Sequence, residues 1–282
     1  MPALRALRAA RPEASLEIAA QPRLGALLVA LGLADRARSV DGLGLEELFG
    51  GAPAERARIL AEMGRVVCWF AGRDVGFARR LAGLVPGAVV STPGDHGPRL
   101  VWEHLVATAG GARDAMVEPV AVGAALREEG RARLVAAGWD GDAPLVIVHP
   151  GAGGAAKRWL ADGFARTIQA LGVVPVVHEG PADAGAVAAL RARLGDDVPV
   201  LRDPPLPALA GALAGARLYL GNDSGVSHLA AMVGAPSLVL FRPENLPWQP
   251  WSAAARVLVV STTALETHDL IAVVAAARAA LG

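Results

Sequence analysis

The sequence has little of what marks secreted, membrane-spanning or nucleic-acid-binding proteins. It has a single cysteine, so no intramolecular disulfide can form, and no uninterrupted apolar run reaches the roughly 18 residues of a membrane span. Lysine plus arginine equals aspartate plus glutamate at 27 each, and the basic residues are scattered. We therefore expect no nucleic-acid partner, and any anionic ligand must be bound by a local site.

The N-terminus also lacks the apolar segment and small-residue cleavage site of a signal peptide, so we expect a cytoplasmic protein. The one cysteine, Cys68, lies in the apolar run Val66–Phe70. This setting is typical of a buried strand thiol rather than of a nucleophile.

What is present is a chain of 282 residues, 53% of them hydrophobic, which is enough for two domains. Strand and helix patterns alternate in both halves and predict an α/β fold with doubly wound parallel sheets. A charged helical stretch from Val120 to Gly138 is followed by the polar loop Gly138 to Pro144. We place the boundary there, between domains of residues 1–138 and 139–282.

The order of elements at the N-terminus is unusual for this fold class. A helical pattern over residues 1–11 precedes the first strand pattern, Leu16 to Ala20. A right-handed β-α-β unit needs a strand before its helix. The order therefore predicts an N-terminal domain that lacks its first strand.

The first glycine-rich segment, His149 to Trp159, follows an apolar strand, at the end of a strand where parallel sheets bind ligands. Its glycines let the backbone approach an anion, and Lys157 or Arg158 can pair with phosphate. A P-loop is excluded because Ala156 precedes the lysine and Arg158 follows it, which leaves no hydroxyl for magnesium.

The same segment also fits a loose dinucleotide fingerprint, Gly151-x-Gly153-x-x-Ala156, with Glu179 after the next strand as a candidate ribose partner. An NAD-dependent enzyme therefore stays open as an alternative.

The second segment, Leu218 to Ala231, runs from a strand through a tight polar loop into a helix for which Ser224 is the predicted N-cap. The free N–H groups and the positive dipole end of such a helix form a ready diphosphate site. His228 falls on the first helical turn and can reach the same place. Taken alone, Asp223 also fits a plain helix cap, and His228 also fits a packed side chain. Both segments, however, follow strands of one inferred sheet, and this convergence favours a binding site.

Together, His149–Gly153 with Lys157-Arg158-Trp159, and Gly221–Ala231 with Gly234-Ala235-Pro236, resemble the paired signature of glycosyltransferase family 9, the heptosyltransferase group. The resemblance implies a GT-B architecture of two Rossmann-like domains, with the donor held by the C-terminal one. It implies inverting transfer of a sugar, commonly heptose from ADP-heptose, to a lipopolysaccharide-core acceptor. The resemblance further implies that the acceptor is a glycolipid or saccharide and that the protein contacts the inner membrane at most peripherally. It implies no obligatory cofactor.

The resemblance also implies roles for individual residues. Lys157 would bind the diphosphate or sugar, Asp223 the sugar hydroxyls, and His228 a phosphate. Ser224 and Gly225 would offer backbone N–H groups to the diphosphate. Asp183 is a weaker match to an acidic nucleoside contact.

The chain departs from the family at the general base. In similar enzymes an aspartate in the loop before the first helix is the usual candidate, and no such loop stands before Met1. Asp95 and His96 are the remaining candidates, in a loop that also reads as an ordinary polar turn. A binding-only, degenerate member is therefore a further alternative.

Two other patterns are ambiguous. Asp140-Gly141-Asp142 fits an Asp-x-Asp metal motif but lies in the presumed linker, so we expect a solvated turn and no metal. Trp248 and Trp251 can stack on a base or sugar, or pack beneath the last helix.

Overall fold

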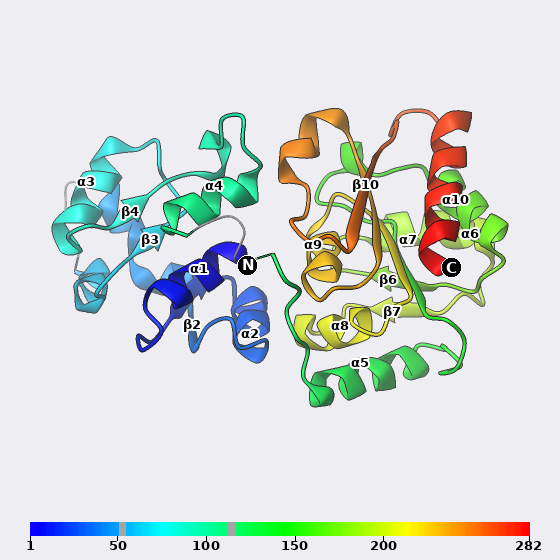
Figure 1. The fold of residues 1–282 in the computed structure, drawn as a ribbon, viewed down its shortest axis with the longest axis horizontal. Helices are drawn as coiled ribbons and strands as arrows, with labels where there is room; N and C mark the ends of the chain where they lie inside the picture. The colour runs from blue at the N-terminus through cyan, green and yellow to red at the C-terminus, as the bar shows by residue number, and fades with distance from the viewer. Residues whose placement is uncertain (51–54, 112–116) are drawn as a thin grey trace. The chain divides into compact units, whose positions relative to one another are not determined.

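The computed structural model describes residues 1–50, 55–111 and 117–282, and these form two compact units, Met1–Glu118 and Pro119–Gly282 (Figure 1). Throughout the described ranges the strand pairings are parallel, and helices alternate with strands, as expected for the α/β class. No helix in these ranges is both long and apolar enough to cross a membrane.

The second unit is built on a six-stranded sheet of order β10-β9-β8-β5-β6-β7. From β5 the chain proceeds outward through β6 and β7, then returns to the other side of β5 for β8, β9 and β10. The topological switch point therefore lies between β5 and β8. The strands are β5 (Val146–His149), β6 (Val176–Glu179), β7 (Val200–Arg202), β8 (Leu218–Asn222), β9 (Ser237–Phe241) and β10 (Ala255–Val259).

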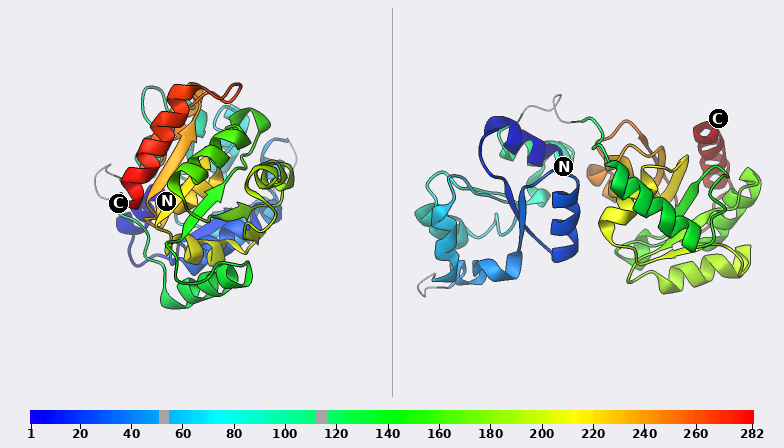
Figure 2. Two further views of the ribbon diagram at one scale, coloured as in Figure 1. Left: turned by 90° about the vertical axis from the view of Figure 1, so that its right-hand side faces the viewer. Right: turned by 90° about the horizontal axis from the view of Figure 1, so that it is seen from below.

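The central strands of this sheet are covered on both faces. Every residue of β5, β8 and β9 is buried, which explains their continuous apolar sequences. Helices α6, α7 and α10 pack together on one face, while α5, α8 and α9 lie on the other (Figure 2). Their bounds are α5 (Ala124–Ala136), α6 (Ala161–Leu171), α7 (Ala184–Leu194), α8 (Leu206–Leu213), α9 (Gly225–Met232) and α10 (Thr267–Leu281).

Helix α5 belongs to the second unit, so the boundary falls at Glu118/Pro119 instead of the predicted 138/139. The cause is a close contact between α5 and α8 that uses two glycines. A side chain on Gly130 would overlap the backbone of Gly211 and Ala212, and one on Gly211 would overlap the carbonyl group of Leu126. The sequence predicted α5 at the end of the first domain, but Gly130 allows it to pack on α8 in the second unit.

Among its described residues, the first unit has four short strands in two separate parallel pairs, β1 with β2 and β3 with β4. Helix α1 packs on α4, and a second apolar cluster forms around η1, η2, η3 and α3. The elements are α1 (Pro2–Ala10), β1 (Glu17–Ala20), α2 (Pro22–Ala30), β2 (Arg36–Ser39), η1 (Val40–Leu43), η2 (Leu45–Leu48), η3 (Arg56–Glu62), β3 (Val67–Cys68), α3 (Val75–Leu84), β4 (Val89–Val90), η4 (Pro93–Asp95) and α4 (Val101–Thr108).

Capping residues mark the ends of α6 and α9. Ser224 is the N-cap of α9, as predicted, and Gly172 ends α6 in the left-handed region at φ 66°. Leu160 is the N-cap of α6, and Asp162 in its first turn pairs with Arg193. Cys68 lies half-buried in β3, and burial raises the pKa of its thiol, as expected for an unreactive cysteine.

Candidate functional site

The two motif loops lie side by side because they follow neighbouring strands. In the register of β5 with β8, Val148 pairs with Leu220 and His149 pairs with Gly221. The glycine-rich loop after β5 and the polar loop after β8 therefore leave the sheet together at the switch point. Open α/β sheets bind ligands at this place.

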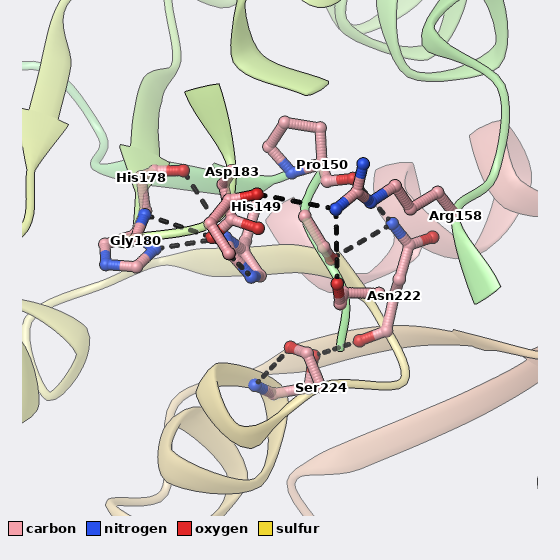
Figure 3. Close-up of polar contacts among 12 residues, drawn as sticks. His149, Pro150, Arg158, His178, Gly180, Asp183, Asn222 and Ser224 are labelled. Atoms are coloured by element: carbon pink, nitrogen blue, oxygen red, sulfur yellow. Dashed lines mark hydrogen bonds and ion pairs between the residues drawn. The ribbon is translucent and has the colours of Figure 1, made fainter. Parts of the chain in front are cut away.

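Asn222, fully buried at the end of β8, ties the two loops together (Figure 3). Its Oδ1 accepts a hydrogen bond from the Trp159 backbone N–H at 2.9 Å. Its Nδ2 donates to the carbonyl oxygens of Pro150 at 2.9 Å and Gly151 at 3.3 Å. A buried amide satisfied in this way fixes the spacing of the loops. Sequence reasoning gave Asn222 no role, although an amide at the end of a buried strand is a usable signal.

The predicted donor-binding residues Lys157 and Asp223 meet in the structure. Lys157 Nζ lies 2.7 Å from Asp223 Oδ2, and Asn245 Nδ2 donates to the same oxygen at 2.6 Å. The Asp223 side chain is 7% exposed and that of Lys157 is 39% exposed. Lys157 is also the only lysine of the chain. The site thus has a partly exposed ammonium group held by a buried carboxylate, and η7 (Pro243–Trp248) adds Asn245, which sequence reasoning missed.

The N-terminus of α9 is next to this pair. Ser224 Oγ accepts from the Ser227 N–H at 3.3 Å, and the Ser227 hydroxyl donates to the Asn222 carbonyl oxygen. The Tyr219 hydroxyl lies 2.9 Å from Ser227 Oγ, and burial raises the pKa of Tyr219, so the phenol stays neutral. A side chain built on Gly225 would meet no atom within 4 Å. The first turn of the helix is therefore open to a ligand.

His228 is half-buried on the same first turn of α9. Burial lowers the pKa of its imidazole, and the carboxylate of Asp223 opposes the shift. A neutral ring at neutral pH is suited to donating one hydrogen bond to an anion.

Asp183 lies against the glycine-rich loop from the segment after β6 (Figure 3). The side chain is buried, and its Oδ2 accepts from the Gly180 N–H at 3.0 Å. Any side chain at Gly151 would overlap this carboxylate, so glycine is required there for contact. His149 Nε2 is 3.8 Å from the same oxygen.

His149 and His178 form a buried pair beside Asp183, with 3.0 Å between their Nδ1 atoms. Burial lowers the pKa of His149, although the Asp183 carboxylate opposes the shift. One nitrogen of the pair must donate and the other accept, so at least one ring stays neutral.

Arg158, a candidate phosphate partner in the sequence, contacts the loops instead. Its guanidinium reaches the carbonyl oxygens of Ala152 and Ala182, each at 3.5 Å. Within the described ranges its buried Nε has no hydrogen-bond partner.

The base candidates lie in the first unit and have local partners. Asp95 Oδ1 is 3.3 Å from an Arg73 guanidinium nitrogen, and His96 Nδ1 is 2.8 Å from the Arg99 carbonyl oxygen. Asp140 caps its own turn by accepting from the N–H groups of Asp142 and Ala143, which lowers its pKa. Over the described residues, no cluster of three acidic, histidine or cysteine side chains could hold a metal.

The fold is that of a glycosyltransferase. The family model described as glycosyltransferase family 9 (heptosyltransferase) matches residues 100–270. The chain belongs to this family, as its two motifs predicted. No curated protein matches it.

Solved structures of the same family share the fold. ADP-heptose lipopolysaccharide heptosyltransferase II of E. coli has a TM-score of 0.76 at 19% identity, covering 99% of this chain and 93% of that one. A family 9 glycosyltransferase of Veillonella parvula has a TM-score of 0.73 at 19% identity, with 99% and 92% covered. E. coli heptosyltransferase WaaC with ADP has a TM-score of 0.66 at 14% identity, with 96% and 92% covered. The α/β fold is therefore the GT-B type that the resemblance implied.

Proposed function

We propose that this enzyme transfers a heptose from ADP-heptose to a lipopolysaccharide-core-type acceptor, with inversion. The observation that carries the proposal is the meeting of Lys157 and the open N-terminus of α9 at one end of the sheet, joined through Asp223. A cation and free backbone N–H groups at one place fit a diphosphate. E. coli WaaC has been solved with ADP and with ADP-2-deoxy-2-fluoro heptose, which supports the choice of donor.

The charge that grows in the transition state determines the roles at the donor. As the bond to the sugar breaks, negative charge accumulates on the leaving diphosphate, and preorganised donors aimed there lower the barrier. Lys157 and the backbone N–H groups of Ser224 and Gly225 supply these donors, and neutral His228 adds one more. No metal or other cofactor is needed in this scheme.

Asp223 has a different role from the cationic and N–H groups, because a carboxylate repels a diphosphate. Its pairing with Lys157 and Asn245 offsets that repulsion and keeps the carboxylate buried. Asp223 therefore accepts hydrogen bonds from the sugar hydroxyls and holds Lys157 in place. Asp183, at the next loop along the sheet, contacts the nucleoside.

Transfer with inversion also requires a base that takes the proton of the acceptor hydroxyl from the opposite face of the sugar. Among the residues of the first unit we assign this to Asp95 or His96. Both are exposed or half-buried, so a hydroxyl can reach them. The acceptor is a saccharide or glycolipid of the lipopolysaccharide-core type. The enzyme contacts the membrane at most peripherally when it binds this acceptor.

The alternative of an NAD-dependent enzyme is disfavoured by the loop after β5. In the dinucleotide fingerprint the glycine loop opens directly into a helix whose N-terminus holds the pyrophosphate. Here Gly151–Ala156 leads into the single turn η6 (Ala155–Lys157), and α6 begins only at Ala161. A binding-only member would bind the donor and transfer nothing, so an activity assay separates it.

The first experiment is a thermal-shift panel with ADP, UDP, GDP and NAD. A ligand at about a hundred times its dissociation constant adds roughly 2.7 kcal/mol of stability, which corresponds to several degrees. We expect stabilisation by ADP that is lost in Lys157→Ala. The matched control is Arg133→Ala, which removes an exposed cation paired with Glu129 elsewhere on the unit. Stabilisation by NAD alone, or by none of the four, would contradict the proposal.

A further inference from the structure

Three titratable side chains from different segments meet in the interior of the second unit (Figure 3). They are His149 at the end of β5, His178 in β6 and Asp183 just before α7, with exposures of 2%, 3% and 8%. The two Nδ1 atoms of the histidines lie 3.0 Å apart, and His149 Nε2 lies 3.8 Å from Asp183 Oδ2. We call these three residues the histidine cluster.

The contacts of His149 favour a ring that carries two protons. Its Nδ1 is 3.0 Å from His178 Nδ1 and 3.3 Å from the His178 carbonyl oxygen, and its Nε2 faces the Asp183 carboxylate. A neutral ring has one N–H and serves only one of these sides as a donor, whereas an imidazolium serves both. Burial acts the other way and lowers the pKa of His149, against the pull of the Asp183 carboxylate.

The Asp183 carboxylate also sets the position of two loops of the candidate site. Its Oδ2 accepts a hydrogen bond at 3.0 Å from the N–H of Gly180, in the loop after β6. A side chain on Gly151, in the loop after β5, would overlap this carboxylate, and so would one on Gly180. Both loops therefore close on Asp183, and whatever holds Asp183 also holds the glycine-rich loop.

The charge on Asp183 also acts at the N-terminus of α9. Burial raises the pKa of Tyr219, and the Asp183 carboxylate raises it further. The Tyr219 hydroxyl lies 2.9 Å from Ser227 Oγ in the first turn of that helix. Charges interact strongly across an interior from which water is excluded. The histidine cluster therefore responds to a negative ligand at the open end of α9.

Other charged groups face the histidine cluster from the elements around it. Arg158, from the loop after η6, lowers the pKa of His149 through its positive charge. Glu179, the last residue of β6, already pairs with Arg202 of β7 at 3.1 Å. Asp183 and a bound anion are therefore the charges that can stabilise a protonated His149.

The neighbouring loop contributes a second group that can take up a proton. Lys157 pairs with Asp223 there, and burial lowers the pKa of His228 on the first turn of α9. An anion at this place would raise the pKa of His228 as well. A test of the histidine cluster must therefore distinguish its rings from His228.

We infer that His149 and His178 are positioning residues of the proposed donor site, and that the pair takes up a proton from solvent when a nucleoside-diphosphate sugar binds. The inference rests on the proposed function, because the charges of the diphosphate favour the imidazolium. The protonated His149 pairs with Asp183, which holds the glycine-rich loop against the ligand. His178 orients the ring of His149, and neither histidine touches the ligand.

Ligand binding and protonation reinforce each other. In the free protein, burial keeps the pKa of His149 below its ordinary 6.5. The diphosphate adds negative charge and raises that pKa, by about one unit for a charge at close range. Protons are therefore taken up below about pH 7, and donor affinity rises as the pH falls through this range.

The test is an NMR titration of the histidine rings with ADP-ribose as the probe. ADP-ribose carries the diphosphate of an ADP sugar and has no phosphate group that titrates near neutral pH. The chain has six histidines, so carbon-13 labelling of the ring Cε1 atoms gives six signals. We expect saturating ADP-ribose to raise the titration midpoint of the pair by about one pH unit. Adenosine, which lacks the charge, should leave the midpoint unchanged.

The two rings of the pair can be assigned in the wild-type protein by elimination. His228→Gln removes one of the other signals, and His96→Gln, His104→Gln and His268→Gln identify the remaining three. A midpoint that moves only at His228 would overturn the inference. Binding of ADP-ribose without any shift at the pair would also overturn it, and would leave the donor site intact. No binding of ADP-ribose would contradict the donor site itself, and the inference would fall with it.

Two substitutions of His178 test its positioning role. His178→Leu removes the Nδ1 contact and should weaken ADP-ribose binding about tenfold, with little change in kcat at saturating donor. His178→Asn keeps a polar group near the Nδ1 position and should restore binding to within about threefold of the wild type. Equal binding by the two variants would show that His178 only packs the core, and would overturn its assigned role.

The affinity of the wild-type protein should follow the proton. The Kd for ADP-ribose should fall about threefold from about pH 7.5 to about pH 6.5, which corresponds to uptake of about half a proton. His149→Gln, which cannot be protonated, should remove this dependence. A Kd that depends on pH equally in the wild type and in His149→Gln would place the proton elsewhere and overturn the inference.

Discussion

The Asn222 side chain donates to the Pro150 carbonyl oxygen at 2.9 Å, and so links the end of β8 to the loop after β5. Replacing Asn222 with Ala leaves the Trp159 N–H and two carbonyl oxygens buried without this partner. We expect a loss of about 3 kcal/mol in the free energy of unfolding, measured by urea denaturation. Asn245→Ala, which removes an amide from one side of Asp223, should cost less. Equal losses would show that Asn222 does not hold the loops.

The single lysine allows a direct measurement at the proposed donor site. Reductive methylation with carbon-13 formaldehyde labels only Lys157 and the N-terminal amine, and it keeps the positive charge. We expect ADP to shift the Lys157 methyl resonance in a saturable way and Asp223→Asn to change its position in the free protein. A Lys157 resonance that ADP leaves unmoved would place the diphosphate elsewhere.

The buried histidine pair makes stability depend on pH. Burial lowers the pKa of His149 below its ordinary 6.5, so below that pH the unfolded chain binds a proton that the folded chain resists. Stability should therefore be highest above about pH 6.5 and fall as the pH drops below that value. His149→Gln should flatten the dependence.

Two glycines of one loop should respond differently to alanine. Gly151→Ala forces the Asp183 carboxylate away from the loop, and we expect a loss of about 1–3 kcal/mol together with weaker ADP binding. A side chain at Gly153 would meet nothing within 4 Å, so Gly153→Ala should cost under about 1 kcal/mol. Urea denaturation and ADP titration of both variants measure the difference. If the two behave alike, the packing of Asp183 against Gly151 is not what fixes this loop.

The contact of α5 with α8 predicts that substitutions in α5 destabilise the C-terminal unit. Gly130→Ala or Gly211→Ala pushes a methyl group into the facing backbone and should cost about 3 kcal/mol or more in the unfolding of the C-terminal unit. Gly185→Ala, on the exposed surface of α7, should stabilise the protein by about 0.5–1 kcal/mol. A mild effect at Gly130 would show that this glycine does not hold α5 against α8.

The sequence was most informative where the signal is local. The cap at Ser224, the glycine loop after β5 and the lysine that follows it could all be found from neighbours along the chain. The contacts that assemble the site are not local, since Asn222 and Asn245 act on residues far away in sequence. No pattern around either amide gives its partner.

The domain boundary and some strands could not be predicted from the sequence, for related reasons. Helix α5 has a charged surface, and only its fit against Gly211 shows where it packs. Strand β2, Arg36–Ser39, has no alternating apolar residues and forms because β1 offers an edge to pair with. Tertiary context decides such elements, and a single sequence carries little of it.

The exposed arginines of β2 have a consequence for handling the protein. All four residues of this strand are exposed, and Arg38 pairs across to Glu17 of β1, so charge covers this end of the sheet. Charged edge strands of this kind resist pairing with other chains. The inner edges of β1 and β3, which face away from β2 and β4, line a cavity whose walls are mostly apolar. Self-association during overproduction should therefore begin at these inner edges, and light scattering would reveal it sooner than any assay of sugar transfer.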